Sequence, residues 1–254
     1  MRILAVDTST DLLCLGVYCN GEFFDYTLNL GRKNSALLAV TIKRVLDTLG
    51  LKAGDFDYFA CGSGPGSFTG IRVGFSTMKA LAWSVKKPFV GVPGLDLLAS
   101  NALDSTNGYI VPLVDARREM VYYAIYKAEG GRLKRLGGYR LSCFTEAVSR
   151  IAAGSTVLGN GLALYKEAIR RDISGVRLLD KDYWPLQPRN LIRLALERIK
   201  RGAVEDPARA EPVYLYPKEC QVRNLRKTRD EGRRTRGENN VKLKTQKSKL
   251  KLKT

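Results

Sequence analysis

The sequence predicts an α/β protein in which an antiparallel meander leads into parallel strands joined by helices. Three apolar runs with strand-like alternation open the chain, at residues 2–8, 12–19 and 22–30. The dipeptide Asn20-Gly21 between the last two is a strong signal for a two-residue hairpin. Two segments with helical periodicity then alternate with two short apolar runs, in the order 35–49, 58–62, 70–85 and 89–92. The resulting order, βββαβαβ, is that of the ribonuclease-H-like and actin-like ATPase folds.

Both predicted helices of this first lobe have an apolar side for the sheet. Ser35 is a suitable N-cap for the first helix, and Gly50 ends it. The sheet-facing stripe of the first helix consists of Leu38, Ala39, Ile42, Val45, Leu46 and Leu49. The corresponding face of the second helix consists of Ile71, Gly74, Phe75, Met78, Leu81, Ala82 and Val85.

After about residue 100 the pattern predicts a smaller α/β lobe. Its expected elements are a strand at 109–115, a hairpin of 120–128 and 132–141, a helix at 144–152, a strand at 156–159, a helix at 162–171 and a strand at 176–179. A last helix, at 189–201, is expected to pack back on the first lobe. The predicted organisation is therefore a first lobe of 1–100 plus 189–217, a second lobe of 101–188, and a basic tail of 218–254.

The composition excludes several classes of protein. Of the 254 residues, 44% are hydrophobic and 27% are charged, so the chain can bury a sizeable core. The chain has no histidine, which excludes a Ser-His or Cys-His nucleophile, a histidine base and a histidine-ligated metal. Its five cysteines form no Cys-x-x-Cys pair, so we expect no zinc knuckle, no disulfide framework and a cytoplasmic location. No apolar window approaches the roughly 18 residues of a membrane span, so we expect no segment that spans a membrane.

The positive charge is concentrated at the C-terminal end. The formal net charge is +18, and residues 218–254 contribute +10 of it through 14 basic and 4 acidic side chains. This segment has no aromatic residue, so we expect it to be disordered. Three roles stay open for it: a solubilising extension, a non-specific RNA-binding arm, or a segment that binds an anionic membrane surface. The absence of bulky apolar anchors counts against the last role, so we expect no membrane partner. The candidate RNA contacts are Arg233, Arg234, Arg236, Lys242, Lys244 and Lys247.

Two segments of the first lobe have the residue types of a phosphate site. Asp7-Thr8-Ser9 follows the first strand, and an acid with hydroxyls and free amides behind it suits a hydrated Mg²⁺ ion, although such turns also form without a ligand. The glycine-rich string at 62–74 runs from a strand into a helix, where backbone amides favour anions. It lacks the Lys-Ser/Thr end of a Walker loop and the spacing of a dinucleotide fingerprint. The candidate nucleotide- or phosphate-binding residues are Asp7, Thr8, Ser9, Gly64, Gly66, Ser67, Thr69 and Gly70.

The opening run Met1-Arg2-Ile3-Leu4-Ala5-Val6-Asp7-Thr8-Ser9 and the string Gly62-Ser63-Gly64-Pro65-Gly66-Ser67-Phe68-Thr69-Gly70-Ile71-Arg72-Val73-Gly74 together resemble the TsaB (YeaZ) family. Two further strings resemble it in the expected order, at 114–122 and 210–215. The likeness covers residues 1 to about 217 and leaves the basic tail outside. Asn34 departs from the family, which often has a histidine there.

The resemblance implies a two-lobed actin-like fold and a non-catalytic scaffold that pairs with TsaD. Together with TsaE, such a pair supports threonylcarbamoyl transfer to N6 of adenosine 37 in transfer RNAs that read ANN codons. The resemblance also implies a homodimer where TsaD is absent, no required cofactor, and at most weak binding of ATP or ADP with Mg²⁺. The related TsaD has a His-x-x-x-His metal motif after the strand that corresponds to 89–92. This chain reads Pro93-Gly94-Leu95-Asp96-Leu97 there, so no metal site is expected.

The outer sides of the two helices predict a protein interface. Only Arg72 and Lys79 are charged within 71–85, and a helix nearly free of charge is normally buried all round. Either another protein covers this outer face, or the second lobe or the last helix does. The candidate partner residues are Ala36, Leu37, Val40, Val73, Ser76, Ala80 and Trp83.

A rival interpretation is an active ATP-dependent kinase or ATPase of the actin-like fold. It requires a second acid beside Asp7, and Asp115, after a strand of the second lobe, is the candidate.

Overall fold

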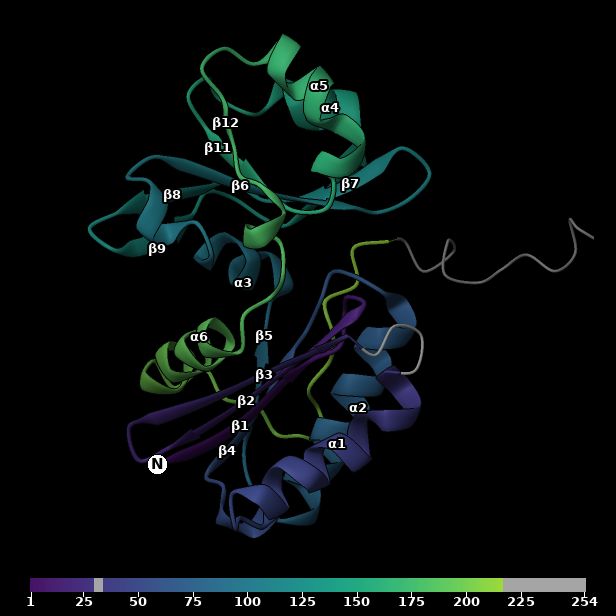
Figure 1. Ribbon diagram of the computed structural model, residues 1–254, viewed down its shortest axis with the longest axis vertical. Coiled ribbons are helices and arrows are strands. Elements are labelled where there is room, and N and C mark those ends of the chain that lie inside the picture. Colours follow the sequence, from purple (N-terminus) through teal and green to yellow (C-terminus); the bar gives the residue numbers. More distant parts are fainter. Residues whose placement is uncertain (30–33, 217–254) are drawn as a thin grey trace, which may run out of the picture. The chain divides into compact units, whose positions relative to one another are not determined.

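The computed structural model describes residues 1–29 and 34–216, and the side chains of the first helix from Leu37 onward. Residues 1–215 form one unit by their mutual contacts. The unit contains two β-sheets, each accompanied by helices (Figure 1). The predicted tail contacts at Arg233, Arg234, Arg236, Lys242, Lys244 and Lys247 lie outside the described residues.

The first sheet has the strand order β3-β2-β1-β4-β5. Its strands are β1 (Arg2–Asp7), β2 (Leu12–Cys19), β3 (Glu22–Asn29), β4 (Tyr58–Gly62) and β5 (Phe89–Val92). Strand β1 is central because its run from Ile3 to Asp7 is wholly buried, and it pairs antiparallel with β2 and parallel with β4. Asn20 and Gly21 both have positive φ angles, of 52° and 104°, as the predicted two-residue hairpin requires.

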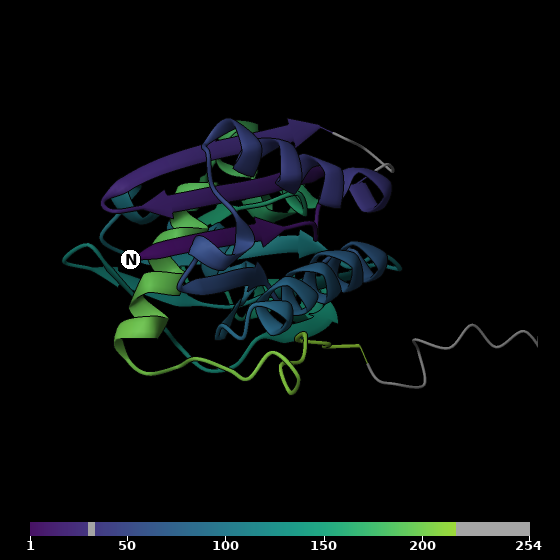
Figure 2. The same ribbon diagram turned by 90° about the horizontal axis from the view of Figure 1, so that it is seen from below.

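Helices cover both faces of this sheet. Helices α1 (Asn34–Thr48) and α2 (Phe68–Ser84) lie on one face, and α6 (Pro188–Lys200) lies on the other (Figures 1 and 2). Gly16 of β2 lets α6 approach closely, because a Cβ there would lie 2.8 Å from the Ile192 side chain. The core between the sheet and the first two helices is built from Leu4, Val6, Leu15, Leu38, Ile42, Phe75 and Met78, among others.

The second sheet has the order β10-β7-β6-β11-β12, with β8 paired to β6 and β9 paired to β8. Its strands are β6 (Tyr109–Asp115), β7 (Met120–Tyr123), β8 (Tyr126–Glu129), β9 (Arg132–Arg135), β10 (Arg140–Cys143), β11 (Thr156–Leu158) and β12 (Arg177–Leu178). Helices α4 (Phe144–Ser149) and α5 (Leu162–Asp172) pack on it through Ala147, Leu162 and Ile169. The described residues also contain short 3₁₀ helices at Ala53–Asp55, Leu103–Ser105 and Lys181–Tyr183.

The predicted hairpin of 120–128 and 132–141 is present, since β8 pairs antiparallel with β9 and β7 pairs antiparallel with β10, but each of its two strands is divided. Both β7 and β8 pair with β6 in one continuous register, but the ladder is interrupted opposite Pro112. Proline has no backbone N–H to donate, which accounts for the gap. The second division falls at 136–139, where Gly137 has a φ of 87°.

Two further differences arise from tertiary packing. Helix α3 (Gly94–Ser100) was not predicted, because Pro93-Gly94 reads as a turn; burial of Leu95 and Leu97 stabilises it as a helix. Ala39 was predicted to face the sheet and is instead exposed, on the side of α1 next to α2. It lies at the edge of the apolar stripe, where one helical position decides between core and surface.

A strained turn connects β6 to β7. Three consecutive non-glycine residues, Arg117, Arg118 and Glu119, have φ angles of 66°, 52° and 60°. Because L-residues pay about 1–2 kcal/mol in this region, we expect Arg118→Gly to raise the free energy of unfolding by about 0.5–1 kcal/mol after the entropy cost of glycine. Urea denaturation measures this change, and a variant less stable than the parent would contradict it.

Candidate functional site

Asp7 ends β1 as a fully buried carboxylate. Its Oδ1 accepts hydrogen bonds from the Ser9 backbone N–H at 2.6 Å and from the Ser9 hydroxyl at 2.7 Å. Its Oδ2 is buried and has no hydrogen-bond partner among the described residues. Such an unsatisfied buried oxygen is costly and is uncommon in folded proteins.

Burial controls the acid–base behaviour around Asp7. It raises the pKa of the Asp7 carboxyl above its ordinary value, and the two hydrogen bonds from Ser9 offset only part of this effect. Burial, and next to it the charge of Asp7, also raise the pKa values of the Cys14 and Cys61 thiols well above their ordinary range. Both cysteines are therefore unreactive apolar residues at neutral pH.

The glycine-rich string packs directly on the turn that contains Asp7. The backbone N–H of Ser67 donates to the Ser9 carbonyl at 2.8 Å, and the Thr8 hydroxyl donates to the Gly70 carbonyl at 2.7 Å. A Cβ at Gly62 would overlap the Asp7 carboxylate, and a Cβ at Gly70 would overlap the Thr8 carbonyl. The glycines are thus required for contact between two parts of the chain itself.

This packing does not fit the predicted nucleotide site. Asp7 is enclosed, so a hydrated Mg²⁺ ion cannot reach its free oxygen in this arrangement. The Ser67 hydroxyl accepts the Gly70 N–H at 3.2 Å, so the start of α2 is capped by the chain itself. The predicted residues divide into buried ones, Asp7, Thr8, Ser9 and Gly64, half-buried ones, Gly66 and Gly70, and exposed ones, Ser67 and Thr69.

The predicted second acid, Asp115, interacts with Arg117, two residues further along the chain. Its carboxylate accepts the Arg117 backbone N–H at 2.8 Å and lies 3.3 Å from the Arg117 guanidinium. Within residues 1–29 and 34–216, no three His, Cys, Asp or Glu side chains group as metal ligands would.

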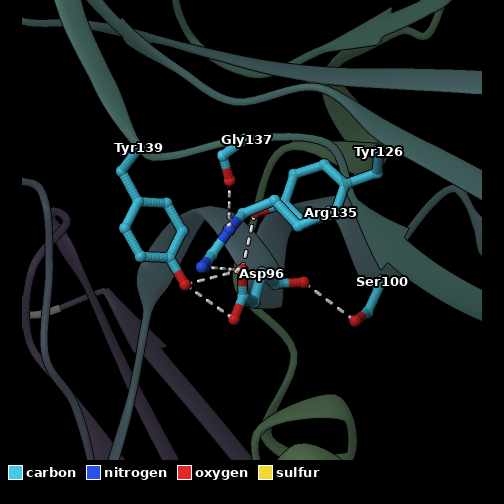
Figure 3. Close-up of polar contacts among 6 residues, drawn as sticks. All are labelled: Asp96, Ser100, Tyr126, Arg135, Gly137 and Tyr139. Atoms are coloured by element: carbon cyan, nitrogen blue, oxygen red, sulfur yellow. Dashed lines mark hydrogen bonds and ion pairs between the residues drawn. The ribbon is translucent and has the colours of Figure 1, made fainter.

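The segment after β5 carries a polar cluster around Asp96 (Figure 3). The Asp96 carboxylate of α3 accepts hydrogen bonds from the hydroxyls of Tyr126, at 2.6 Å, and Tyr139, at 2.9 Å, and Arg135 lies 3.7 Å away. Burial, and next to it the charge of Asp96, raise the pKa of both tyrosines, so they stay protonated donors. Asp96 therefore joins α3 to β8 and to the segment that follows β9.

The outer face of α1 and α2 is exposed. Leu37, Val40 and Trp83 keep 37%, 47% and 69% of their surface accessible, so neither the second sheet nor α6 covers them. Ser76 and Ala80 are also exposed, whereas Val73 is half-buried against the core. Nothing is described of the Ala36 side chain. We call the exposed residues Leu37, Val40, Ser76, Ala80 and Trp83 the outer helix face.

An apolar hollow of about 280 Å³ lies between α1 and α2, next to the outer helix face. Its lining includes the apolar side chains of Ala39, Ile42, Leu46 and Leu81, and Lys43, Asp47 and Lys52 also border it. Helical periodicity could not show this hollow, because it depends on how two helices lie against each other.

Comparison with known proteins agrees with this fold. The sequence model of the family described as "TsaD: tRNA N6-adenosine threonylcarbamoyltransferase" matches residues 29–173, more than half of the chain. The tRNA threonylcarbamoyladenosine biosynthesis protein TsaB of Bacillus subtilis is 29% identical over 181 residues, 70% of this chain and 78% of the relative. The protein of that name from Escherichia coli is 25% identical over 220 residues, 85% and 94% of the two chains.

The chain belongs to the TsaB (YeaZ) family. The solved structure of YeaZ from Pseudomonas aeruginosa has a TM-score of 0.73 and 26% identity, and the match covers 84% of this chain and 99% of that one. The predicted α/β fold of the actin-like class is thereby confirmed. In the described part of this TsaB-family chain, no helix has the length and apolar character needed to span a membrane.

The buried acid of this TsaB-family chain gives its stability a distinctive pH dependence. The pKa of Asp7 is higher in the folded chain than in the unfolded chain, so the folded chain binds this proton more tightly. The stability that the bound proton adds is therefore complete below the ordinary pKa of 3.8 and is lost as pH rises through the raised pKa. We expect Asp7→Asn to be more stable than the parent by about 1–3 kcal/mol at pH 7, with the difference disappearing toward pH 4. Urea denaturation across this pH range measures it, with exposed Asp104→Asn as control; parallel curves for Asp7→Asn and the parent would contradict the burial account.

Proposed function

We propose that this chain is the dimerisation subunit of the machinery that forms N6-threonylcarbamoyladenosine in transfer RNA. It pairs with TsaD, which performs the transfer to N6 of adenosine 37 in transfer RNAs that read ANN codons. TsaE completes the assembly. The observation that carries the proposal is the outer helix face, an exposed and charge-poor surface in a chain of this family.

The outer helix face has the composition of a protein interface. Its centre combines the small side chains of Ser76 and Ala80, which allow two helices to approach closely, with Trp83 as an aromatic anchor. Leu37 and Val40 extend the apolar surface onto α1. The neighbouring hollow of about 280 Å³ is large enough to receive an apolar side chain of a partner.

The proposed role needs no chemistry from this chain. Without histidine, the chain cannot build a His-ligated metal site. In the segment after β5, where TsaD has its metal motif, the Asp96 carboxylate accepts hydrogen bonds from the hydroxyls of two tyrosines, Tyr126 and Tyr139. The enclosed Asp7 and the self-capped glycine string favour a structural role over a nucleotide site. We therefore propose that the chain requires no cofactor, that it binds ATP or ADP with Mg²⁺ weakly at most, and that it is not itself the transferase.

The basic tail is proposed to be an RNA-binding arm. Its 14 basic side chains, which outnumber its 4 acidic ones, would neutralise phosphates, and the release of counterions makes such binding steeply dependent on salt. The candidate contacts are Arg233, Arg234, Arg236, Lys242, Lys244 and Lys247.

Co-purification tests the proposed pairing. Co-expressed with tagged TsaD, the chain should elute with it in a defined complex, and alone it should form a homodimer through the same outer helix face. The rival ATP-dependent enzyme makes a different prediction, namely robust ATP hydrolysis by the lone chain that is lost in Asp7→Ala. Such turnover, or the absence of any complex with TsaD, would overturn the proposal.

A further inference from the structure

The exposed side of α2 extends past the outer helix face toward the start of the helix. Phe68 and Arg72 precede Ser76 and Ala80 at intervals of four residues, and all four residues are exposed. Side chains four positions apart form a ridge along a helix, and such ridges pack into the grooves of other helices. One continuous ridge therefore runs from Phe68, the first residue of α2, to Ala80, close to the exposed Trp83.

Two aromatic rings hold Arg72 in a fixed direction on this ridge. The Arg72 guanidinium lies 3.8 Å from the centre of the Phe68 ring and 6.0 Å from the centre of the Tyr214 ring. Its Nε–H donates to the Tyr214 hydroxyl at 3.3 Å. These contacts restrict a long side chain before any partner arrives, so less entropy is lost when the guanidinium binds a ligand. We call Phe68, Arg72 and Tyr214 the arginine clamp.

The segment that carries Tyr214 is fixed along α2 by the chain itself. Lys79 of α2 donates to the Ala210 carbonyl at 2.6 Å, and the Val213 backbone N–H donates to the Ser63 carbonyl at 2.8 Å. Tyr214 follows directly after these two hydrogen bonds. The arginine clamp is therefore already assembled in the free chain.

The guanidinium of the arginine clamp has no acidic partner within the chain as far as it is described. No carboxylate of residues 1–29 and 34–216 forms an ion pair with Arg72, and the hydrogen bond to Tyr214 uses only its Nε–H. The terminal nitrogens therefore remain for a ligand. A planar guanidinium binds a carboxylate through parallel N–H···O hydrogen bonds, and arginine and tyrosine are among the residues that dominate binding energy at protein interfaces.

The surroundings of the arginine clamp favour a protein carboxylate over the phosphates of RNA. In the described helix α2 the charged residues are Arg72 and Lys79, and Lys79 is engaged by the Ala210 carbonyl. RNA binding draws its affinity from many cations that follow the phosphates. A single arginine on an uncharged ridge, close to Trp83, instead fits a partner surface that is apolar except for one acid.

We propose that the protein partner of the outer helix face carries an aspartate or glutamate whose carboxylate binds Arg72 in the arginine clamp. The inference rests on the proposed pairing with TsaD, and it extends that surface to the start of α2 and to Tyr214. Arg72 then contributes to specificity. A partner with a matching apolar surface but no acid at this point would leave the guanidinium buried and unpaired, and would bind more weakly.

Titration calorimetry of the full-length chain with TsaD tests the ion pair. We expect Arg72→Gln to weaken binding roughly tenfold to a hundredfold, because hydrogen bonds to a charged group are lost while a polar side chain is kept. Arg72→Lys, which keeps the charge but cannot form parallel hydrogen bonds, should lose less. The affinity of the parent should fall as salt rises, and that of Arg72→Gln should fall less steeply.

Controls separate the ion pair from other effects of the substitution. Arg132 of β9 is also exposed and has no ion pair among the described residues, so Arg132→Gln should bind TsaD like the parent. TsaD variants with single Asp→Asn or Glu→Gln changes should include one that weakens binding of the parent but not of Arg72→Gln. If Arg72→Gln is poorly folded by circular dichroism, Arg72→Lys takes its place in the same comparison.

The outcomes distinguish this inference from the proposed pairing. If the parent chain does not bind TsaD, the pairing fails and the inference fails with it. If a folded Arg72→Gln variant binds TsaD like the parent, or loses affinity without a change in salt dependence, the ion pair is refuted and the pairing stands. If that variant instead loses affinity for an oligouridylate while its TsaD binding is unchanged, the arginine clamp is an RNA contact and the carboxylate is refuted.

Discussion

Ser76→Glu combined with Ala80→Glu is expected to abolish co-purification with TsaD and to leave the folded chain intact. The two positions are one helical turn apart on the outer helix face and are both exposed, so glutamates there are solvated in the free chain. In a complex they would be buried without partners, at several kcal/mol per ion, which corresponds to roughly a thousandfold or greater loss of affinity. Val73 is unsuitable for this test because it is half-buried against the core.

A matched substitution controls for the added charge. Leu164 of α5 is 64% exposed but lies away from the outer helix face, so Leu164→Glu should pair with TsaD normally. Thermal unfolding should be the same for the double variant and the parent. If the double variant is folded and still elutes with TsaD, the assignment of the outer helix face is wrong.

Gly70→Ala is expected to destabilise the chain by about 3 kcal/mol or more, enough to make it largely insoluble. The added methyl group would overlap the backbone carbonyl of Thr8, which the buried β1 strand prevents from moving. If the glycine string serves to pack α2 on the turn after β1, this loss occurs without any nucleotide.

Gly54→Ala is the matched control for this prediction. Nothing lies within 4 Å of a Cβ at Gly54, and its φ is not positive, so the change should stay within about 0.5 kcal/mol. Circular dichroism of the two variants during urea denaturation measures the difference. Equal stabilities would show that the glycine-rich string accommodates the added methyl group. They would contradict the packing role and favour a ligand-binding role for the string.

Local patterns predicted most of the elements, because strands such as β1 and helices such as α1 have clear periodicity and turn residues. The two segments that departed from the prediction depend on distant partners. The division between β7 and β8 follows from Pro112, which lies on a neighbouring strand, and helix α3 forms because Leu95 and Leu97 are buried. Periodicity within one segment cannot report either cause.

The site was predicted less completely, for a similar physical reason. Glycines in a strand-to-helix loop indicate close approach, but they do not say whether a phosphate or the chain itself approaches; here Gly70 meets Thr8. The hydrogen bond from Arg72 to the Tyr214 hydroxyl joins residues 142 positions apart, a distance at which no sequence motif signals contact. The outer helix face, in contrast, followed from helical periodicity, and only its exposure required the structure.

The central claim is that threonylcarbamoyl transfer requires this chain as a partner of TsaD. The most direct measurement is the content of N6-threonylcarbamoyladenosine in transfer RNA incubated with threonylcarbamoyl donor, TsaD, TsaE and ATP, with and without this chain. We predict modification with the parent chain, and background levels both without it and with the Ser76→Glu, Ala80→Glu variant. Full modification in its absence, or with that folded variant, would contradict the account.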